Sequence, residues 1–149
     1  RAAFPADKPV MVRLSATDWI EGGWDVDQSV VFCQALKDLG CDMVDVTSGG
    51  LDQRQKITVG PGYQVGFSER IRREAGIATM AVGQITDPVQ AETILLSGQA
   101  DMVALARGML WDPRWTWKAA VAMGEEIALP APYARCNPAL RATPFVSRK

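Results

Sequence analysis

Residues 77–113 contain two short apolar segments separated by one helix-sized stretch, and this spacing limits the folds open to the chain. Residues 77–82 and 102–106 are predicted strands. Between them, Asp87 is the expected N-cap of a helix and Pro88 its first residue. Two strands joined by a helix of this length pair in parallel through a right-handed crossover. The segment therefore predicts an α/β protein with a parallel sheet.

The helix inside this segment has clear sequence boundaries. Gln90 is placed to complete a capping box with Asp87. Gly98 is the expected stop at the carboxyl end. Between these ends, a buried stripe is expected from Ala91, Ile94 and Leu95.

Gly83 and Arg107 each follow a predicted strand of this segment. The carboxyl ends of parallel strands meet at the edge of the sheet where ligands bind. A glycine lets backbone N–H groups approach an anion, and an arginine supplies a forked cation. A phosphate group is therefore expected between these two positions.

Further elements surround this segment. Residues 9–16 and 42–47 are predicted strands. A helix is expected over residues 27–39, with Val31, Ala35 and Leu39 in register. Another is expected through Phe67, Ile71 and Ala75, and a last one after Asp112-Pro113 with Trp117, Ala120 and Val121 buried. A loop of residues 51–65 lies between the second strand and its helix, and loops of that length are often functional.

Four strands alternating with four helices fit two architectures. A doubly wound sheet carries a glycine-rich fingerprint after its first strand, and residues 15–23, SATDWIEGG, do not match it. A (β/α)8 or TIM barrel places phosphate after its seventh and eighth strands. On that basis residues 1–128 are expected to be the carboxyl-terminal half of a TIM barrel, strands five to eight, and residues 129–149 an irregular proline-rich tail. Half a barrel exposes two strand edges, so a partner is expected to complete it.

Composition excludes several function classes. The 16 basic and 17 acidic residues are well mixed, so no nucleic acid and no membrane are expected as partners. The three cysteines lack metal-ligand spacing, which indicates a cytoplasmic protein without a metal site. The chain has no histidine, which removes the commonest general acid.

Arg13 stands inside the predicted strand 9–16, where a charge is unusual. Two interpretations are equally open. It pairs with a carboxylate of the core, or it faces a ligand.

Five segments together resemble the Old Yellow Enzyme family, nearest to its YqjM or xenobiotic-reductase-like branch. The likeness spans roughly residues 4–135 in unbroken order. The segments are VRLSATDW (12–19), DMVDVTSGG (42–50), PGYQVGFSERIR (61–72), VGQITDPVQAE (82–92) and ADMVALARGMLWDP (100–113).

This resemblance implies several cofactor contacts. Arg13 matches the family residue that lies against the flavin pyrimidine near N1 and O2, where a fixed cation stabilises the reduced flavin. Gly83 matches the glycine that approaches the FMN phosphate. Ala106 and Arg107 match the pair that completes the phosphate site.

Other implied positions are at the barrel mouth and the tail. Ser48 and Gly49 are expected near the flavin. Arg135 resembles an arginine that in some relatives reaches across a dimer interface into the neighbouring active site. Tyr63 and Tyr133 do not match the proton-donating tyrosine of the family, and no catalytic residue is assigned.

The implied parent activity is reduction of activated C=C bonds, such as those of α,β-unsaturated carbonyl compounds, by NADPH or NADH and FMN. Hydride passes through flavin N5 in a ping-pong cycle. The family groups that bind the substrate lie in the amino-terminal half, which this chain does not contain. Two alternatives stay open: a non-catalytic half-barrel that needs a partner chain to bind flavin, and another phosphate-binding barrel enzyme.

Overall fold

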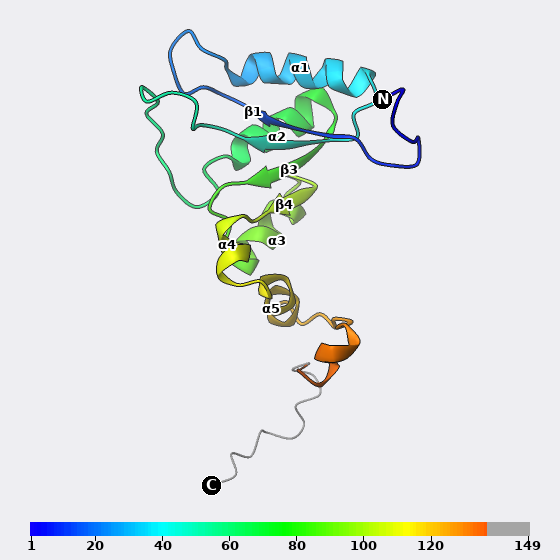
Figure 1. Ribbon diagram of the computed structural model, residues 1–149. Coiled ribbons are helices and arrows are strands. Elements are labelled where there is room, and N and C mark those ends of the chain that lie inside the picture. Colours follow the sequence, from blue (N-terminus) through cyan, green and yellow to red (C-terminus); the bar gives the residue numbers. More distant parts are fainter. Residues whose placement is uncertain (137–149) are drawn as a thin grey trace. The chain divides into compact units, whose positions relative to one another are not determined.

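The computed structural model describes residues 1–136, and their central feature is a parallel four-stranded sheet (Figure 1). The strand order along the sheet follows the order in the sequence. All three neighbouring pairs are parallel. The strands are β1 (Met11–Ser15), β2 (Met43–Thr47), β3 (Ala78–Val82) and β4 (Met102–Ala104).

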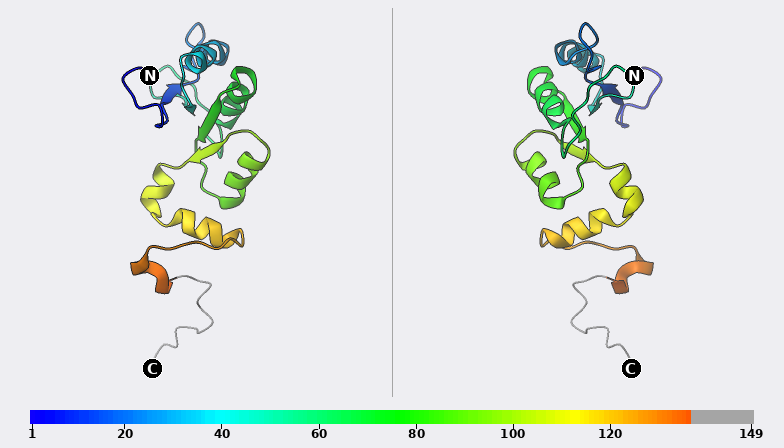
Figure 2. Two further views of the ribbon diagram at one scale, coloured as in Figure 1. Left: turned by 90° about the vertical axis from the view of Figure 1, so that its right-hand side faces the viewer. Right: turned by 90° about the vertical axis from the view of Figure 1, so that its left-hand side faces the viewer.

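Three helices lie on one side of this sheet (Figure 2): α1 (Val26–Asp38), α2 (Val65–Ala75) and α3 (Pro88–Leu96). Successive side chains of a strand point to opposite faces. On the helix side, Val44 and Val46 are fully buried in a cluster with α1 and α2. A doubly wound sheet carries helices on both faces, whereas sequential strands with helices on one face are the arrangement of a barrel segment. The predicted α/β fold of half-barrel type is thus confirmed.

The other face of the sheet carries no helix of residues 1–106. A row of register partners crosses it through Arg13, Asp45, Met80 and Met102. We call this side of the sheet the open face. In a closed barrel this face points to the interior.

Element ends differ from the expected ones by one or two residues, and one difference concerns the site. β4 ends at Ala104, so Ala106 lies beyond the strand. The expected buried face of α1 is wrong, because Val31 and Leu39 are 66% and 74% exposed. The buried residues of α1 are Ser29, Val30 and Cys33. The Ser29 hydroxyl donates to the Ala16 carbonyl at 2.9 Å and accepts from Trp24 Nε1 at 2.6 Å.

The helix caps also differ from the expectation. At α3, the Asp87 side chain accepts from the Gln90 backbone N–H at 2.9 Å, but the return bond of a capping box is not formed. A complete capping box forms at α1, between Asp25 and Gln28. Gly98 adopts φ 73° directly after α3, as expected for a helix stop.

Contacts divide the chain into two compact units, residues 1–106 and a second unit that begins at Arg107. The second unit contains α4 (Arg107–Trp111), α5 (Trp115–Ala122) and the 3-10 helix η1 (Ala131–Cys136). The expected division at residue 128 stays a prediction.

Three expectations for the second unit are wrong. An additional helix, α4, precedes Asp112. α5 begins after Arg114, because Asp112 accepts from the Arg114 N–H in a turn outside the helix. No residue of α5 is buried. Of the expected irregular tail, residues 131–136 form η1 and residues 137–149 lie outside the described residues, so this expectation stays a prediction.

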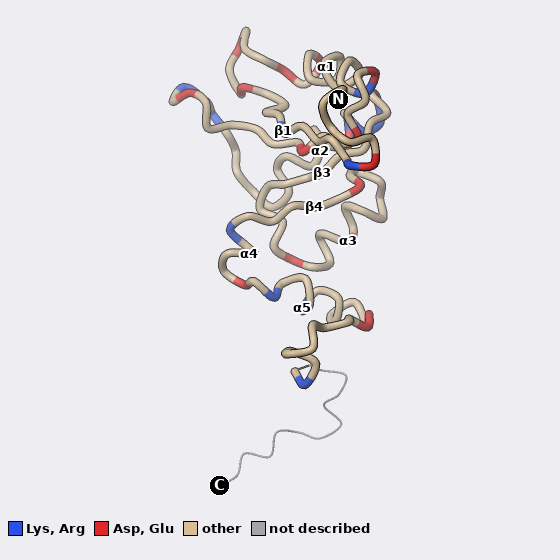
Figure 3. Tube along the Cα trace, turned by 45° about the vertical axis from the view of Figure 1, so that its right-hand side comes forward, with Lys and Arg blue, Asp and Glu red and all other residues tan. Residues whose placement is uncertain are grey.

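Charges of both signs are interspersed along the described trace (Figure 3). Within residues 1–136, no helix has the length and apolar character required to cross a bilayer. The same residues contain no group of three or more acidic or cysteine side chains arranged to hold a metal ion.

Candidate functional site

The carboxyl ends of β1, β2 and β3 open onto three loops, which we call the rim: residues 16–25, 48–64 and 83–87. Because the strands are parallel, these loops lie at one edge of the sheet. Ser48 and Gly49 follow β2 directly, and Gly83 follows β3. Three of the predicted site residues therefore share this edge.

Gln64 links the ends of β2 and β3 at the rim. Its side chain donates from Nε2 to the Val82 carbonyl at 2.7 Å. Its Oε1 accepts from the Ser48 hydroxyl at 2.6 Å and more weakly from the Thr47 hydroxyl at 3.4 Å. Gln64 is 2% exposed, so these bonds are shielded from water.

Sequence reasoning missed Gln64. Gln64 lies just before α2, in the long loop of residues 51–65. The length of that loop indicates a function but does not single out any residue in it. A polar side chain at this point gives no periodic signal, because its partners are 16 to 18 residues away in the sequence.

Gly83 has a structural reason to be glycine. Its φ is +132°, and a Cβ there would lie 2.8 Å from Gln64 Nε2 and 3.1 Å from the Tyr63 ring. Its carbonyl accepts from the Gly62 N–H at 2.8 Å. The close approach that requires glycine is therefore made by residues 62–64 of the same chain, and the predicted approach to a phosphate stays a prediction.

Arg13 and Asp45 form an ion pair on the open face. Arg13 Nη1 donates to Asp45 Oδ2 at 2.8 Å, and the two side chains are 58% and 15% exposed. Asp45 Oδ1 is buried and has no hydrogen-bond partner among residues 1–136. Of the two interpretations of Arg13, pairing with a carboxylate is observed. The exposed remainder of the guanidinium also leaves donors for a ligand.

The remaining predicted residues lie near or in the second unit. Ala106 ends the first unit, and Arg107 begins α4. Arg135 is exposed in η1. Next to it, the Tyr133 ring contacts Trp117 with 5.4 Å between ring centroids, and the Arg114 guanidinium lies 5.2 Å from the Tyr133 ring.

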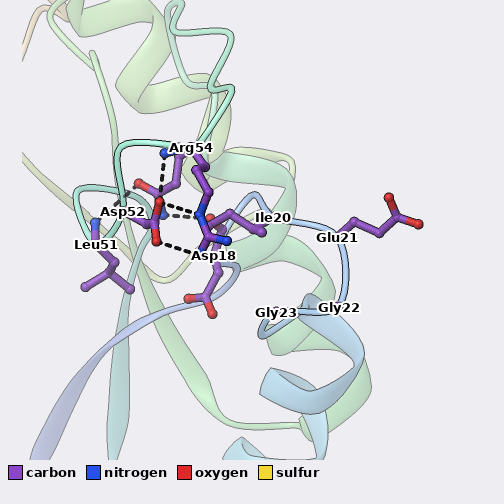
Figure 4. A pocket seen from close by; sticks show the side chains of 9 residues that line it. Asp18, Ile20, Glu21, Gly22, Gly23, Leu51, Asp52 and Arg54 are labelled. Atoms are coloured by element: carbon purple, nitrogen blue, oxygen red, sulfur yellow. Dashed lines mark hydrogen bonds and ion pairs between the residues drawn. The ribbon is translucent and has the colours of Figure 1, made fainter.

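A cavity of about 350 Å³ opens between the first two rim loops (Figure 4). Arg54 and Asp52 face each other in it through two hydrogen bonds of 2.8 and 3.0 Å. This contact lowers the pKa of Asp52 and raises that of Arg54. Arg54 is thus ion-paired with a neighbour in its own loop. None of the predicted site residues lines this cavity.

Gln55 ties the walls of this cavity together. Its Nε2 donates to the Asp18 carbonyl at 2.6 Å, and its Oε1 accepts from the Gly50 N–H at 2.8 Å. The two rim loops after β1 and β2 are thus joined by Gln55, and those after β2 and β3 by Gln64.

Residues 1–126 match the profile of the NADH:flavin oxidoreductase / NADH oxidase family. The chain belongs to this family. Among its relatives, the NADPH dehydrogenase of Geobacillus sp. (strain WCH70) is 47% identical over 129 residues. That of Bacillus subtilis (strain 168) is 43% identical over the same length. The resemblance to Old Yellow Enzymes is thereby confirmed.

These relatives are longer than the chain. The alignments cover 87% of this chain but only 38% of either relative. The aligned part of the chain thus spans less than two fifths of the length of the relatives it matches.

Solved structures support the fold. A 2-naphthoyl-CoA reductase in complex with 2-naphthoyl-CoA superimposes with a TM-score of 0.68 at 21% identity, over 80% of this chain and 18% of that chain. The protein GGGPS from Thermoplasma volcanium gives a TM-score of 0.50 at 17% identity, over 81% of this chain and 51% of that chain. At these identities the likeness concerns the fold alone.

Proposed function

We propose that the chain is the flavin-contacting, carboxyl-terminal part of an NAD(P)H-dependent enzyme that reduces activated C=C bonds of α,β-unsaturated carbonyl-type compounds. Membership of the flavin oxidoreductase family supports the flavin. The observation that carries the proposal is Arg13, whose guanidinium is more than half exposed on the open face although it stands in the middle of a strand.

The donor chemistry of the rim and the open face fits FMN. Arg13 offers guanidinium N–H groups to the carbonyl oxygens of a flavin ring. For the phosphate, Gly83 offers side-chain-free backbone, and Ala106 with Arg107 offers an N–H group and a cation. Ser48 and Gly49 stand at the same edge. When bound, FMN supplies hydride transfer through N5, between reduced nicotinamide and substrate in a ping-pong cycle.

The proposed partner is an amino-terminal half that covers the open face. Met11 and Met102 are 44% and 46% exposed there. Relatives are more than twice as long as the chain, which supports a further segment. That segment would supply the groups that polarise the substrate, and Arg135 is proposed to reach a neighbouring subunit of a homo-oligomer.

We place the protein in the cytoplasm. Cys33, Cys41 and Cys136 are free thiols, which suits a reducing compartment.

The test is FMN binding, measured by the quenching of flavin fluorescence. The chain is titrated alone and together with the amino-terminal remainder of the Bacillus subtilis relative. Arg107→Ala and Arg13→Met are each expected to weaken binding at least about tenfold, because a charge-assisted contact contributes roughly 1.5–3 kcal/mol. Arg54→Ala is the matched control, since this rim arginine is also ion-paired but lines a cavity that none of the predicted FMN-contacting residues lines.

Two results would overturn the proposal. One is flavin that is never quenched, even with the added amino-terminal segment. The other is quenching that Arg54→Ala weakens as much as Arg107→Ala does. With both segments present, consumption of NADPH and of a simple cyclic enone then tests the reaction itself.

The second candidate is a non-catalytic half-barrel that binds flavin only with a partner chain. The absence of histidine from the sequence favours it, because the usual substrate-polarising side chains are missing. Quenching that requires the added segment, without enone reduction, would support this candidate over the first.

A further inference from the structure

Gln64 is the most buried polar group of the rim that the proposed function does not use. We propose that it is a positioning residue, which holds Ser48 and Gly83 at a fixed separation and sets the direction of the Ser48 hydroxyl. The inference deepens the proposed function and rests on it for the identity of the ligand.

The positions of its three partners show what Gln64 connects. Ser48 is the first residue after β2, and Val82 is the last residue of β3. Two neighbouring parallel strands have no ladder bonds beyond their ends. The Gln64 side chain bridges the two strand ends instead. Its hydrogen bonds are 2.6 Å long to the Ser48 hydroxyl and 2.7 Å long to the Val82 carbonyl.

Gly83 is fitted to the same side chain. The Gln64 amide nitrogen occupies the space where a Cβ of residue 83 would lie, at 2.8 Å. The Gly83 carbonyl is also fixed, by the N–H of Gly62 two residues before Gln64. The backbone conformation of Gly83, with φ +132°, is thus determined from residues 62–64.

Hydrogen-bond chemistry decides the direction of the Ser48 hydroxyl. The Val82 carbonyl can only accept, so the amide nitrogen of Gln64 must face it. The amide oxygen then faces Ser48, whose hydroxyl must donate. The Ser48 proton is therefore committed to Gln64, and Ser48 Oγ meets a ligand only as an acceptor. A phosphate at this edge would be bound by backbone N–H groups and arginine rather than by this hydroxyl.

Two variants distinguish a hydrogen-bonding role of Gln64 from a role in which its side chain only fills space. Gln64→Met keeps similar length without the bonds. Gln64→Glu can form all of them when protonated, because its O–H donates to Val82 and its C=O accepts from Ser48. When ionised it has only acceptors and repels the Val82 carbonyl. The hydrogen-bond partners of the Gln64 side chain within residues 1–136 are two hydroxyls and a carbonyl, none of which titrates between pH 5 and 9.

Amide hydrogen exchange of the 149-residue chain, monitored by NMR from pH 5 to 8, tests the proposal. In Gln64→Met, exchange of the Gly62 N–H, which donates to the Gly83 carbonyl at the rim, is expected to be about tenfold faster, while Val44 and Val46 in the core keep their protection. In Gln64→Glu, rim protection is expected at low pH and lost as the pH rises through the pKa of the introduced carboxyl group, which burial raises. Wild-type protein at each pH corrects for the chemistry of exchange.

Gln55→Glu is the matched control, because Gln55 joins the loops after β1 and β2 and does not contact β3. It is expected to leave the exchange rate of the Gly62 N–H unchanged. The proposal is overturned by unchanged rim protection in Gln64→Met, by equal loss of rim and core protection, or by a Gln64→Glu response that does not depend on pH.

FMN titration of the same variants is the second measurement. If the wild-type chain quenches FMN, Gln64→Met should bind it about tenfold more weakly and Gln64→Glu should follow the pH dependence of the rim. If wild-type protein does not bind FMN with or without the amino-terminal segment, the proposed function fails, while hydrogen exchange still decides the role of Gln64.

Discussion

Arg13 and Asp45 are register partners on β1 and β2, and their side chains are joined at 2.8 Å on the face that no helix of the first unit covers. Asp45 is the more buried of the two and keeps one oxygen without a partner among residues 1–136. A charge on the open face is therefore balanced within the sheet, before any ligand or partner is bound.

Removing either member of this pair should have unequal effects. Arg13→Met leaves a largely buried carboxylate unpaired and is expected to cost about 1–3 kcal/mol of unfolding free energy. Asp45→Asn leaves a half-exposed arginine and should cost less than about 1 kcal/mol. Urea unfolding measures both. An equal or larger cost for Asp45→Asn would contradict this ranking.

Two glycines in neighbouring segments should respond in opposite directions to alanine. Gly83→Ala combines φ +132° with a contact of 2.8 Å and is expected to destabilise the fold by about 1–3 kcal/mol. Gly66, near the start of α2, has no atom within 4 Å of the added Cβ and no positive φ. Gly66→Ala is expected to stabilise by about 0.5 kcal/mol. Thermal unfolding of both variants checks the signs.

The Asp101 carboxylate should make the free energy of unfolding depend on pH in the acidic range. Its carboxylate accepts from Arg72 at 3.0 Å and from the Thr79 N–H at 2.9 Å. The Arg72 bond is the main cause that lowers the pKa of Asp101. A carboxyl group with a lowered pKa in the folded state stabilises the fold at pH values above its unfolded-state pKa of about 3.9. This stabilisation is lost as the pH falls through the folded-state pKa.

Asp101→Asn should therefore flatten the loss of stability below about pH 4. Urea midpoints at several pH values measure this effect. Asp7→Asn, at an exposed carboxylate, is the control. A slope unchanged from wild type in Asp101→Asn would contradict the assignment.

The cysteines should differ in reactivity. Burial, with a smaller contribution from Cys41, raises the pKa of Cys33 to about 11. Its thiolate fraction at pH 8 is about 100-fold below that of an ordinary thiol. Iodoacetamide should modify the exposed Cys136 first and Cys33 only after unfolding. Mass spectrometry of labelled peptides measures the order, and early labelling of Cys33 would contradict the burial argument.

The sequence by itself determined the order of strands and helices within residues 1–106 and the edge of the sheet where Ser48, Gly49 and Gly83 lie. Short apolar strands, Asp-Pro helix starts and glycine stops are local signals, because each depends on neighbours within a few residues. The segments 12–19, 61–72 and 82–92 also carried the resemblance to flavin oxidoreductases, which the family match confirms.

The tertiary structure decided which groups meet. Whether Arg13 pairs with a carboxylate depended on the register that places it beside Asp45, 32 residues away. The burial of Ser29 on α1 depended on its two hydrogen-bond partners in the first rim loop, Ala16 and Trp24. Gln64 and the backbone of Gly83 are coupled across 18 residues or more. Such contacts leave no periodic pattern in the sequence, because burial of a polar group is favourable only when the folded chain supplies its hydrogen-bond partners.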